Sequence, residues 1–317
     1  MRALVTGGAG FIGSNLVDAL VDSGAEVVAF DDLSTGYANN VHPQATLIEG
    51  DIADQDAVAR ATAGCDVVFH EAAHRAVARS VERPLETDRA NVAGTLTVLV
   101  AARDAGVRRV VSASSSSIYG GATQLPTPES APLIPRSPYA VSKLAAEHYC
   151  RVFWELYGLE TVALRYFNVF GPRQRPDSMY AAVIPLFIDA LRSGMAPEIH
   201  GDGHQSRHFA FVSDAVDANL RAADAPPERC AGRAYNIAGE RSYDLLELLG
   251  LLEAIVGRSV APRHTEPRSG DVRNSLADLT AAQRDLGYRP QVSFTEGLRR
   301  TVAWFDNRVG VEPGTAR

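Results

Sequence analysis

The sequence predicts an α/β fold in which a doubly wound parallel sheet is followed by a smaller C-terminal α/β lobe. Apolar, strand-like runs alternate with amphipathic, helix-like runs from residue 1 to about 168, which is the pattern of βαβ units and a parallel sheet. The first strand-like run leads directly into a glycine-rich turn. The alternation stops after Gly171 and Pro172, so we place the end of the first lobe near residue 170. A chain of 317 residues is long enough for both lobes.

Six strands and the helices between them account for the first lobe. The strands are predicted near residues 2–6, 26–31, 45–49, 66–70, 108–114 and 161–167. The two longest helices, about 86–105 and 138–157, carry pairs of alanines that would let another helix approach closely. A homodimer through these two helices is therefore one hypothesis, and packing of the same faces within the chain is the other.

The second lobe is predicted from shorter pieces. A polar stretch at residues 173–179 precedes a helix at 181–193, and short strand-like and helical segments continue to about residue 305. We assign residues 171–206 and 242–309 to this lobe and expect the segment at about 207–241 to return to the first one. Residues 310–317, with two glycines and a proline, are predicted to be a disordered tail.

The glycine-rich turn TGGAGFIG points to a nucleotide cofactor. Its glycines, Gly7, Gly10 and Gly13, let the backbone turn tightly and approach a pyrophosphate, which then lies on the N-terminus of the helix that begins near Phe11. A strand before the turn and an amphipathic helix after it are the context that this motif needs. The first lobe is therefore predicted to be a dinucleotide-binding, or Rossmann, sheet.

Asp31 indicates which dinucleotide binds. It ends the second strand, eighteen residues after Gly13, where a carboxylate can accept hydrogen bonds from both hydroxyls of the adenosine ribose. No arginine or lysine lies between Asp31 and Tyr37 to hold a 2′-phosphate. The sequence thus favours NAD over NADP.

Composition excludes several classes of partner. The net charge is −7 and the pI is about 5.6, which argues against a nucleic-acid binder. No apolar run approaches membrane-spanning length, and the chain enters its first strand without room for a signal peptide. Cys65, Cys150 and Cys230 are scattered, as in a reduced cytoplasmic protein.

Three side chains suggest acid–base chemistry. Tyr139 and Lys143 are four residues apart in the run SPYAVSKLAAEHY and would lie one helical turn apart on one face, with Ser115 in an upstream run. Bringing a phenol of pKa ~10 to neutrality requires about 4 kcal/mol of phenolate stabilisation. An ammonium at about 4 Å in an effective dielectric of ~20 supplies that amount.

Residues 70–74 read HEAAH, a formal match to a zinc-hydrolase motif. That motif needs both histidines on one face of a helix. Here it follows the apolar run CDVVF, and strand geometry would separate His70 from His74. We therefore predict no metal site.

Taken together, these motifs resemble the extended short-chain dehydrogenase/reductase family, and within it the NAD-dependent UDP-sugar 4-epimerases. The resemblance covers nearly the whole chain. The matching stretches are TGGAGFIGSNL (6–16), GDI (50–52), HxAA (70–73), NVAGTL (91–96), SSSSIYG (114–120), YAVSK (139–143), RYFNVFGPRQ (165–174), YAAVIP (180–185), GDGHQSRHF (201–209) and RSGDVRNSLAD (268–278).

The resemblance implies a reversible C4 epimerisation of a UDP-hexose through a 4-keto intermediate, with transient reduction of bound NAD. Tyr139 would be the base, Ser115 would hydrogen-bond the 4-oxygen, and Lys143 would hold the cofactor ribose and lower the pKa of Tyr139. The implied cofactor contacts are Gly7, Gly10, Phe11, Ile12, Gly13, Asp31, Asp51, Ile52, Ala72, Asn91, Tyr139, Lys143 and Phe167.

The same resemblance implies the substrate contacts. Two negative phosphates on an acidic protein require local arginines. Arg207 and Arg268 match phosphate or ribose contacts, and Asp271 matches a carboxylate on the uridine ribose. The full set is Arg75, Ser115, Ser116, Ser117, Asn168, Gln174, Val183, Arg207, Arg268, Asp271 and Ser275.

Neighbouring activities are separated by a few positions. The 4,6-dehydratases of the family need an acidic pair where this chain has Ser116 and Ser117, and its uronic-acid epimerases tend to have threonine at Asn168. Small Ser275, at a position that gates a 2-acetamido group, makes UDP-GlcNAc and UDP-GalNAc the preferred pair, with UDP-glucose and UDP-galactose also accepted. Arg75 could pair with a C6 carboxylate, so a UDP-glucuronate 4-epimerase stays an alternative.

Two other hypotheses remain for the function of the chain. One is a nucleotide-sugar dehydrogenase or reductase. The other is an NAD-sensing regulator without catalysis, which the intact Ser115, Tyr139 and Lys143 disfavour. His208 and Glu71 depart from the family pattern.

Overall fold

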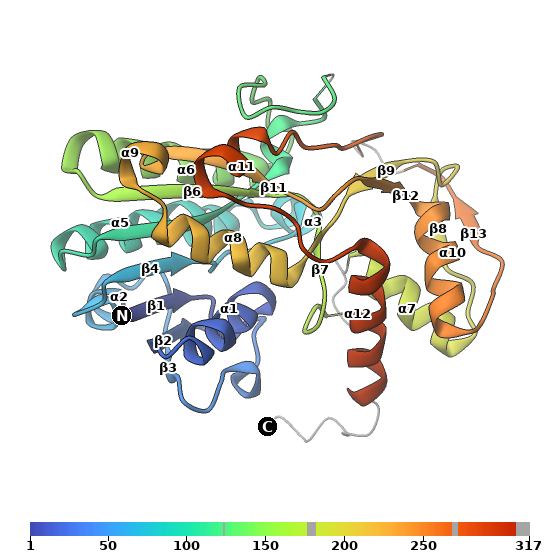
Figure 1. Cartoon of the computed structure of the whole chain (residues 1–317), viewed down its shortest axis with the longest axis horizontal. Helices are drawn as coiled ribbons and strands as arrows, with labels where there is room; N and C mark the ends of the chain where they lie inside the picture. Colours follow the sequence, from blue (N-terminus) through green and yellow to red (C-terminus); the bar gives the residue numbers. More distant parts are fainter. Residues whose placement is uncertain (123, 176–181, 268–271, 309–317) are drawn as a thin grey trace.

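The computed structural model describes residues 1–122, 124–175, 182–267 and 272–308. Its centre is a seven-stranded sheet in which all paired strands are parallel, in the order β11-β6-β5-β4-β1-β2-β3 (Figure 1). The six predicted strands are confirmed, with shifts of at most one residue at their ends. The strands are β1 (Arg2–Thr6), β2 (Glu26–Asp31), β3 (Thr46–Glu49), β4 (Val67–His70), β5 (Arg109–Ser115), β6 (Glu160–Tyr166) and β11 (Arg233–Ile237).

Helices cover both faces of this sheet, so the strands are apolar on both sides. Alternate residues of β1 show the division: Ala3 and Val5 face one core, and Leu4 faces the other. The first core is closed by α1 (Phe11–Asp22) and α8 (Val212–Asp224). The second is closed by α2 (Gln55–Thr62), α5 (Gly94–Asp104) and α6 (Pro138–Tyr157).

Successive strands are added toward one edge of the sheet from β1 to β3 and toward the other edge from β4 onward, so the winding of the sheet reverses between β3 and β4. The strand order runs outward from β1 to β3 and then returns to place β4 on the other side of β1. Ligands of such open sheets bind at this reversal, outside the carboxyl ends of the strands. Gly7 follows β1 and Glu71 follows β4, so both lie at this edge.

The predicted helix over 86–105 is interrupted. The structure has α4 (Pro84–Asp88), a π-helical turn (Arg89–Ala93) and then α5, preceded by a short α3 (Val77–Glu82). Such turns occur often at functional sites because they re-aim side chains. The predicted helix over 138–157 is continuous, begins at an Ser137 cap whose side chain accepts from the Ala140 N–H, and ends at Gly158 in the left-handed region (φ 68°).

The second lobe packs around a group of phenylalanines. Phe170, Phe209, Phe211 and Phe294 stack edge to face or in parallel, with centroids 5.0 to 6.1 Å apart. Its elements, and the short ones elsewhere in the chain, are as follows: η1 (Ala38–Asn40), η3 (Ser116–Tyr119), β7 (Val169–Phe170), α7 (Val183–Ser193), β8 (Glu198–His200), β9 (Ser206–His208), β10 (Ala210–Phe211), α9 (Pro227–Cys230), β12 (Ser242–Asp244), α10 (Leu245–Val256), β13 (Arg263–Thr265), α11 (Thr280–Leu286) and α12 (Phe294–Arg308).

The segment that was expected to return to the first lobe supplies α8 and β11, and β11 pairs with β6 at the edge of the main sheet. The exact bounds of the two lobes stay a prediction, and the proposed tail at 310–317 lies outside the described residues. The three cysteines are free and buried. Within the described ranges, no helix is both long and apolar enough to cross a membrane.

Candidate active site

A large cleft opens at the carboxyl ends of the central strands, with a volume of about 1210 Å³. This exceeds the roughly 300–1,000 Å³ typical of a site for one small molecule, so it has room for a dinucleotide and a second ligand. The predicted site residues that line it are Gly7, Gly10, Phe11, Ile12, Gly13, Asp31, Asp51, Ile52, Ala72, Arg75, Ser115, Ser116, Ser117, Tyr139, Lys143, Phe167, Asn168, Gln174, Arg207 and Ser275.

The glycine turn has the geometry that a bound pyrophosphate needs. Gly7 is in the left-handed region (φ 70°), and a Cβ there would lie 2.7 Å from the Ala72 nitrogen. A Cβ on Gly13 would lie 2.1 Å from the Gly7 carbonyl oxygen, so the helix could not pack this close to the turn with any side chain. Gly10 precedes α1 without a side-chain cap, which leaves the first backbone N–H groups of the helix for an anion.

Asp31 is fixed where the adenosine ribose is expected. Its Oδ2 accepts from the Ala9 N–H at 3.0 Å and its Oδ1 from the Leu33 N–H at 2.9 Å. Burial raises the pKa of this carboxyl, and the two backbone hydrogen bonds oppose that effect. Each oxygen retains acceptor capacity for a ribose hydroxyl. A carboxylate held here would repel a 2′-phosphate.

Two further contacts complete the adenosine end. Asp51 forms an ion pair with Arg89 at 2.6 Å, and its Oδ1 accepts from the Ala53 N–H. Arg175 lies over the ring of Tyr37, 4.6 Å from its centroid, and donates to the Thr35 carbonyl. The sequence prediction missed Arg175, because it reaches this end of the cleft from 140 residues away.

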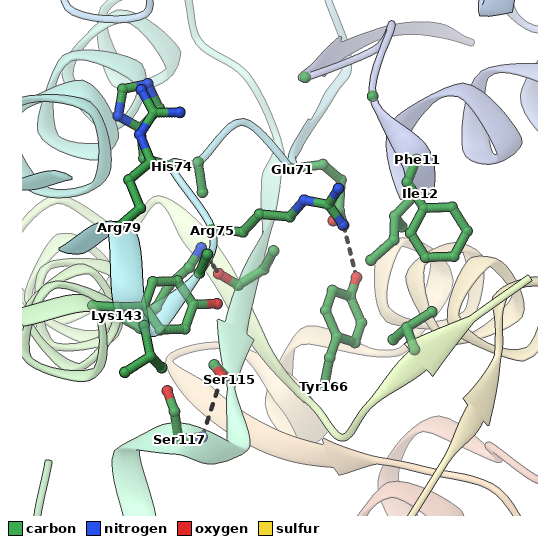
Figure 2. Close-up of a pocket in the computed structure, with 18 of the residues that line it drawn as sticks. Phe11, Ile12, Glu71, His74, Arg75, Arg79, Ser115, Ser117, Lys143 and Tyr166 are labelled. Atoms are coloured by element: carbon green, nitrogen blue, oxygen red, sulfur yellow. Dashed lines mark hydrogen bonds between the residues drawn. The ribbon is translucent and has the colours of Figure 1, made fainter. Parts of the chain in front are cut away.

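Ser115 and Tyr139 line the same cleft, and the Ser115 hydroxyl opposes the rise in the pKa of Tyr139. The Ser115 Oγ also accepts from the Ser117 N–H at 3.2 Å, so the serine hydroxyl is free to donate to the tyrosine oxygen. Figure 2 shows Ser115 and Ser117 side by side at the end of β5. The Ser117 Oγ is buried and has no hydrogen-bond partner among the described residues, so it could bond a ligand.

The position of Lys143 differs from the sequence-based estimate. Its Nζ donates to the Ala113 carbonyl at 2.8 Å, and the side chain is buried. The pKa of Tyr139 is raised by burial, and the groups that oppose this rise are the Ser115 hydrogen bond and the Arg75 charge. Lys143 is not among the groups that shift the pKa of Tyr139 in the protein by itself, so the prediction that Lys143 and a bound nicotinamide together lower that pKa stays a prediction. Burial also lowers the pKa of Lys143, to about 8.

The HEAAH residues have other roles. His70 ends β4, and its two ring nitrogens contact the Thr6 Oγ1 at 2.8 Å and the Thr95 Oγ1 at 2.9 Å. Burial lowers its pKa to about 3, so the ring is neutral. His74 lies in the irregular segment between β4 and α3, off any shared helix face. Neither nitrogen of His70 has a lone pair available for a metal ion.

The part of the cleft predicted to hold the substrate is built by residues from both lobes. The Asn168 Nδ2 donates to the His208 carbonyl at 3.1 Å, and the Ser275 Oγ accepts from the His208 N–H at 3.1 Å. Gln174 donates to the Val169 carbonyl, and its buried Oε1 has no hydrogen-bond partner in the part of the chain that the structure describes. His208 itself is structural: its Nδ1 accepts from the Ala277 N–H, and its Nε2 bonds the Gly239 carbonyl at 2.9 Å.

Arg75 lies at the open part of the cleft, and its charge acts on Tyr139. Within the described ranges it forms no hydrogen bond or ion pair with the protein, unlike Arg207, which donates to the Ser206 carbonyl at 3.0 Å. Burial and the nearby Arg175 charge lower the pKa of Arg75. An anionic ligand beside Arg75 would stabilise its positive charge and so oppose both effects.

Two predicted residues do not line the cleft. The Asn91 side chain accepts from the His74 N–H and donates to the His74 carbonyl and to Ser142, so it fixes the segment after β4. Val183 begins α7. Arg268 and Asp271 lie outside the described residues.

The chain was compared with known proteins. The model of the NAD dependent epimerase/dehydratase family matches residues 3–238. A UDP-glucose 4-epimerase of Mycolicibacterium smegmatis is 41% identical over 315 residues, which span 97% of this chain and 99% of the relative. The solved structure of UDP-glucose 4-epimerase from Thermotoga maritima with UDP-glucose has a TM-score of 0.93 at 37% identity, covering 98% of this chain and 100% of that one.

A second solved structure is UDP-N-acetylglucosamine 4-epimerase from Methanobrevibacter ruminantium M1 in complex with UDP-N-acetylmuramic acid. It has a TM-score of 0.92 at 38% identity and covers 97% of this chain and 98% of that one. The family match spans both the glycine turn and the segment with Ser115, Tyr139 and Lys143. The chain therefore belongs to the NAD dependent epimerase/dehydratase family and is an enzyme that uses NAD.

Proposed function

We propose that this enzyme catalyses the reversible C4 epimerisation of a UDP-hexose through a 4-keto intermediate. The observation that carries this proposal is that Ser115, Tyr139 and Lys143 line the same cleft as the dinucleotide turn. The relatives whose names state an activity, reported above, support the same reaction class.

The residues have distinct tasks in this reaction. Bound NAD, held by the glycine turn and Asp31, supplies the hydride acceptor and donor. Tyr139 takes the proton of the sugar 4-hydroxyl and later returns it. Ser115, fixed by the Ser117 N–H, hydrogen-bonds the 4-oxygen and keeps it within reach of Tyr139. Lys143, whose ammonium is buried in the cleft, is assigned to hold the ribose of the cofactor.

Epimerisation needs no second substrate, because the 4-keto sugar turns in the site and is reduced on its other face. Dehydration across C5 and C6 would need an acid to protonate the leaving hydroxyl. Ser116 and Ser117 occupy the positions after Ser115 and carry no carboxyl group. We therefore favour an epimerase over a dehydratase.

The preferred substrate pair is UDP-GlcNAc and UDP-GalNAc, with UDP-glucose and UDP-galactose also accepted. Ser275 lines the cleft and leaves room where a larger side chain would exclude a 2-acetamido group. Arg207 also lines the cleft and suits the diphosphate.

UDP-glucuronate is the second candidate substrate. Arg75 favours it, because its guanidinium acts on Tyr139 and has no carboxylate partner among the described residues. A carboxylate at C6 is bonded to the carbon next to C4, so it would lie on the Tyr139 side of the sugar.

Incubation of the enzyme with each of the three UDP-sugars, followed by proton NMR of the products, tests these proposals together. A 4-epimer from UDP-GlcNAc that disappears in Tyr139→Phe supports the preferred function, and a 4-epimer from UDP-glucuronate alone supports the second candidate. Stoichiometric NADH at 340 nm without an epimer would indicate a dehydrogenase and contradict both.

We also propose a homodimer through the two long helices. One face of α6 exposes an apolar stripe at helical spacing, with Val141, Tyr149 and Leu156 exposed and Ala145 and Val152 partly so. Leu85 on α4 is 84% exposed. Analytical ultracentrifugation at micromolar concentration should give a dimer, and Val141→Glu with Leu156→Glu should give a monomer. A monomeric wild-type enzyme would contradict the proposal.

A further inference from the structure

The chain after β7 lines the cofactor part of the cleft with a short irregular segment, residues 172–175, which we call the strap. Three of its side chains line the cleft, as do Phe11 at the start of α1 and Thr35 in the loop after β2. The glycine turn before α1 is the predicted contact for the pyrophosphate, and Asp31 at the end of β2 is the predicted contact for the adenosine ribose. The strap therefore shares the cleft with both elements that are expected to hold NAD.

One end of the strap is attached to α1. The Arg173 Nη2 donates to the Asp18 Oδ2 at 2.7 Å, in an ion pair whose side chains are 22% and 32% exposed. The Asn15 Nδ2 donates to the Pro172 carbonyl at 3.3 Å and to the Phe11 carbonyl of its own helix at 2.8 Å. Phe11, Asn15 and Asp18 follow one another at helical spacing, so this face of α1 connects the strap to the helix N-terminus.

The backbone of the strap turns sharply at Arg173. Its φ is 72°, in the left-handed region that residues other than glycine rarely adopt. The Gln174 N–H donates to the Gly171 carbonyl at 3.2 Å across this turn. Such a backbone conformation persists where surrounding contacts hold it, and the ion pair with Asp18 is one such contact.

The other end of the strap is attached to the loop after β2. The Arg175 Nη1 donates to the Thr35 carbonyl at 3.2 Å, and the guanidinium lies 4.6 Å from the centroid of the Tyr37 ring. The Tyr37 N–H and the Asn40 Nδ2 each donate to the Ala9 carbonyl at 3.1 Å. The glycine turn thus holds the loop, and the loop holds the strap.

These attachments have a consequence for the exchange of NAD. They join the strap to the two elements on which the pyrophosphate and the adenosine ribose are expected. All of the contacts are between protein groups, so they can form before NAD binds as well as after. A ligand that has to pass a closed segment exchanges slowly in both directions, whereas the loss of a direct contact speeds only its release.

We propose that residues 172–175 form a strap that retains NAD in the cleft and that has to lift before NAD can enter or leave. Asp18 and Tyr37 are positioning residues that act through Arg173 and Arg175. Slow exchange suits an enzyme that regenerates NAD within each turnover. The inference concerns the cofactor and does not depend on which sugar reacts.

The first test measures NAD exchange in the whole enzyme by stopped-flow fluorescence with etheno-NAD, using unlabelled NAD as the chase for release. Asp18→Asn keeps the size of the side chain and leaves Arg173 in place, and Asp18 is not among the described residues that line the cleft. Association and release should both become at least about fivefold faster, the effect of losing one partly buried ion pair. Unchanged rates would overturn the proposal, and so would faster release with unchanged association.

Asp217→Asn is the matched control for this ion pair. Asp217 accepts from Arg221 at 2.6 Å on α8, and the two side chains are 32% and 40% exposed. Neither is among the described residues that line the cleft. Both exchange rates should stay within about twofold of the wild type. A change as large as that of Asp18→Asn would show that the rates report a general loosening of the fold and would overturn the proposal.

The second test addresses the other end of the strap. Tyr37→Leu removes the ring beneath Arg175 and Tyr37→Phe keeps it, so only Tyr37→Leu should speed both rates, by about threefold or more. Arg241→Gln is the control, because Arg241 lies 3.8 Å from the centroid of the Tyr243 ring, outside the described lining of the cleft. Equal rates in the two Tyr37 variants would contradict the strap. All rates are measured without a sugar, so an enzyme that forms no 4-epimer would refute the proposed function and leave this inference standing.

Discussion

The ion pair between Glu147 and Arg165 joins the catalytic helix to the sheet, and its removal is the sharpest test of the fold. Glu147 is one turn after Lys143 on α6, and Arg165 is on β6. The Arg165 Nη2 and Nε donate to the two carboxylate oxygens at 2.5 and 3.1 Å, and the Ser114 Oγ donates to the Glu147 Oε2 at 2.9 Å. The side chains of the ion pair are only 5% and 11% exposed.

Glu147→Gln keeps the size of the side chain and one acceptor but leaves the Arg165 charge buried without a counter-charge. Breaking one partner of a buried pair costs ~3–5 kcal/mol. Arg165 retains hydrogen bonds to the Tyr119 hydroxyl and the Glu129 carbonyl, so we expect the lower end, about 3 kcal/mol. For a chain of 317 residues that loss lowers Tm by about 4–5 °C.

Circular dichroism melting of the holoenzyme measures this effect, and Glu155→Gln on the same helix is the control. Glu155 pairs with Arg151 at 3.5 Å, and both side chains are more than half exposed, so its loss should cost under ~0.5 kcal/mol. If Glu147→Gln melted within 1 °C of the wild type, or if Glu155→Gln lost as much, the buried pair would not anchor α6.

Four other predictions follow from single positions. Tyr139→Phe should lower kcat at least about 100-fold in the epimerase assay with little change in NAD binding, and a smaller loss would remove Tyr139 as the base. Gly13→Ala should weaken NAD binding about tenfold by fluorescence titration, since its Cβ would lie 2.1 Å from the Gly7 oxygen, whereas Gly250→Ala, with open space around it, should not. Ser275→Tyr should reduce kcat/KM for UDP-GlcNAc about tenfold or more relative to UDP-glucose, and an equal reduction for both would refute its gating role. Because burial raises the pKa of Glu71 from 4.5 to about 7, the wild type loses stability as pH rises from 4.5 to 7. Glu71→Gln should therefore be about as stable as the wild type near pH 4.5 and up to about 3 kcal/mol more stable above pH 7, and a difference in urea unfolding that does not vary with pH would contradict this.

The sequence could predict those parts of the candidate site whose positions follow from local sequence patterns. The Gly7 turn and Asp31 belong to one βαβ unit, whose glycine spacing and strand ends are visible in the sequence. Ser115 ends a strand and Tyr139 begins a helix, and both positions follow from local patterns. The spacing also placed Lys143 on the correct helix face, but its contact with the Ala113 carbonyl depends on how α6 packs against β5.

Other contacts could not be predicted, because they join residues far apart in the chain. Glu71 and Tyr166 are 95 residues apart, and Asn219 is 53 residues beyond Tyr166. Arg175 reaches Tyr37 from the polar stretch after β7. The sequence did show that Glu71 stands where the family that it resembles has an apolar residue. That departure did not indicate which residue Glu71 would contact.

The sequence by itself thus determined the parallel sheet and the cofactor turn, and it named the candidate acid–base residues. Each of these depends on periodicity or on the conformational freedom of glycine over fewer than about 30 residues. Only the tertiary structure decided the charge environment of Tyr139 and Lys143, including the raised pKa of the tyrosine. That environment depends on burial and on distances between β4, β6, α6 and α8, and electrostatic energies change steeply with both.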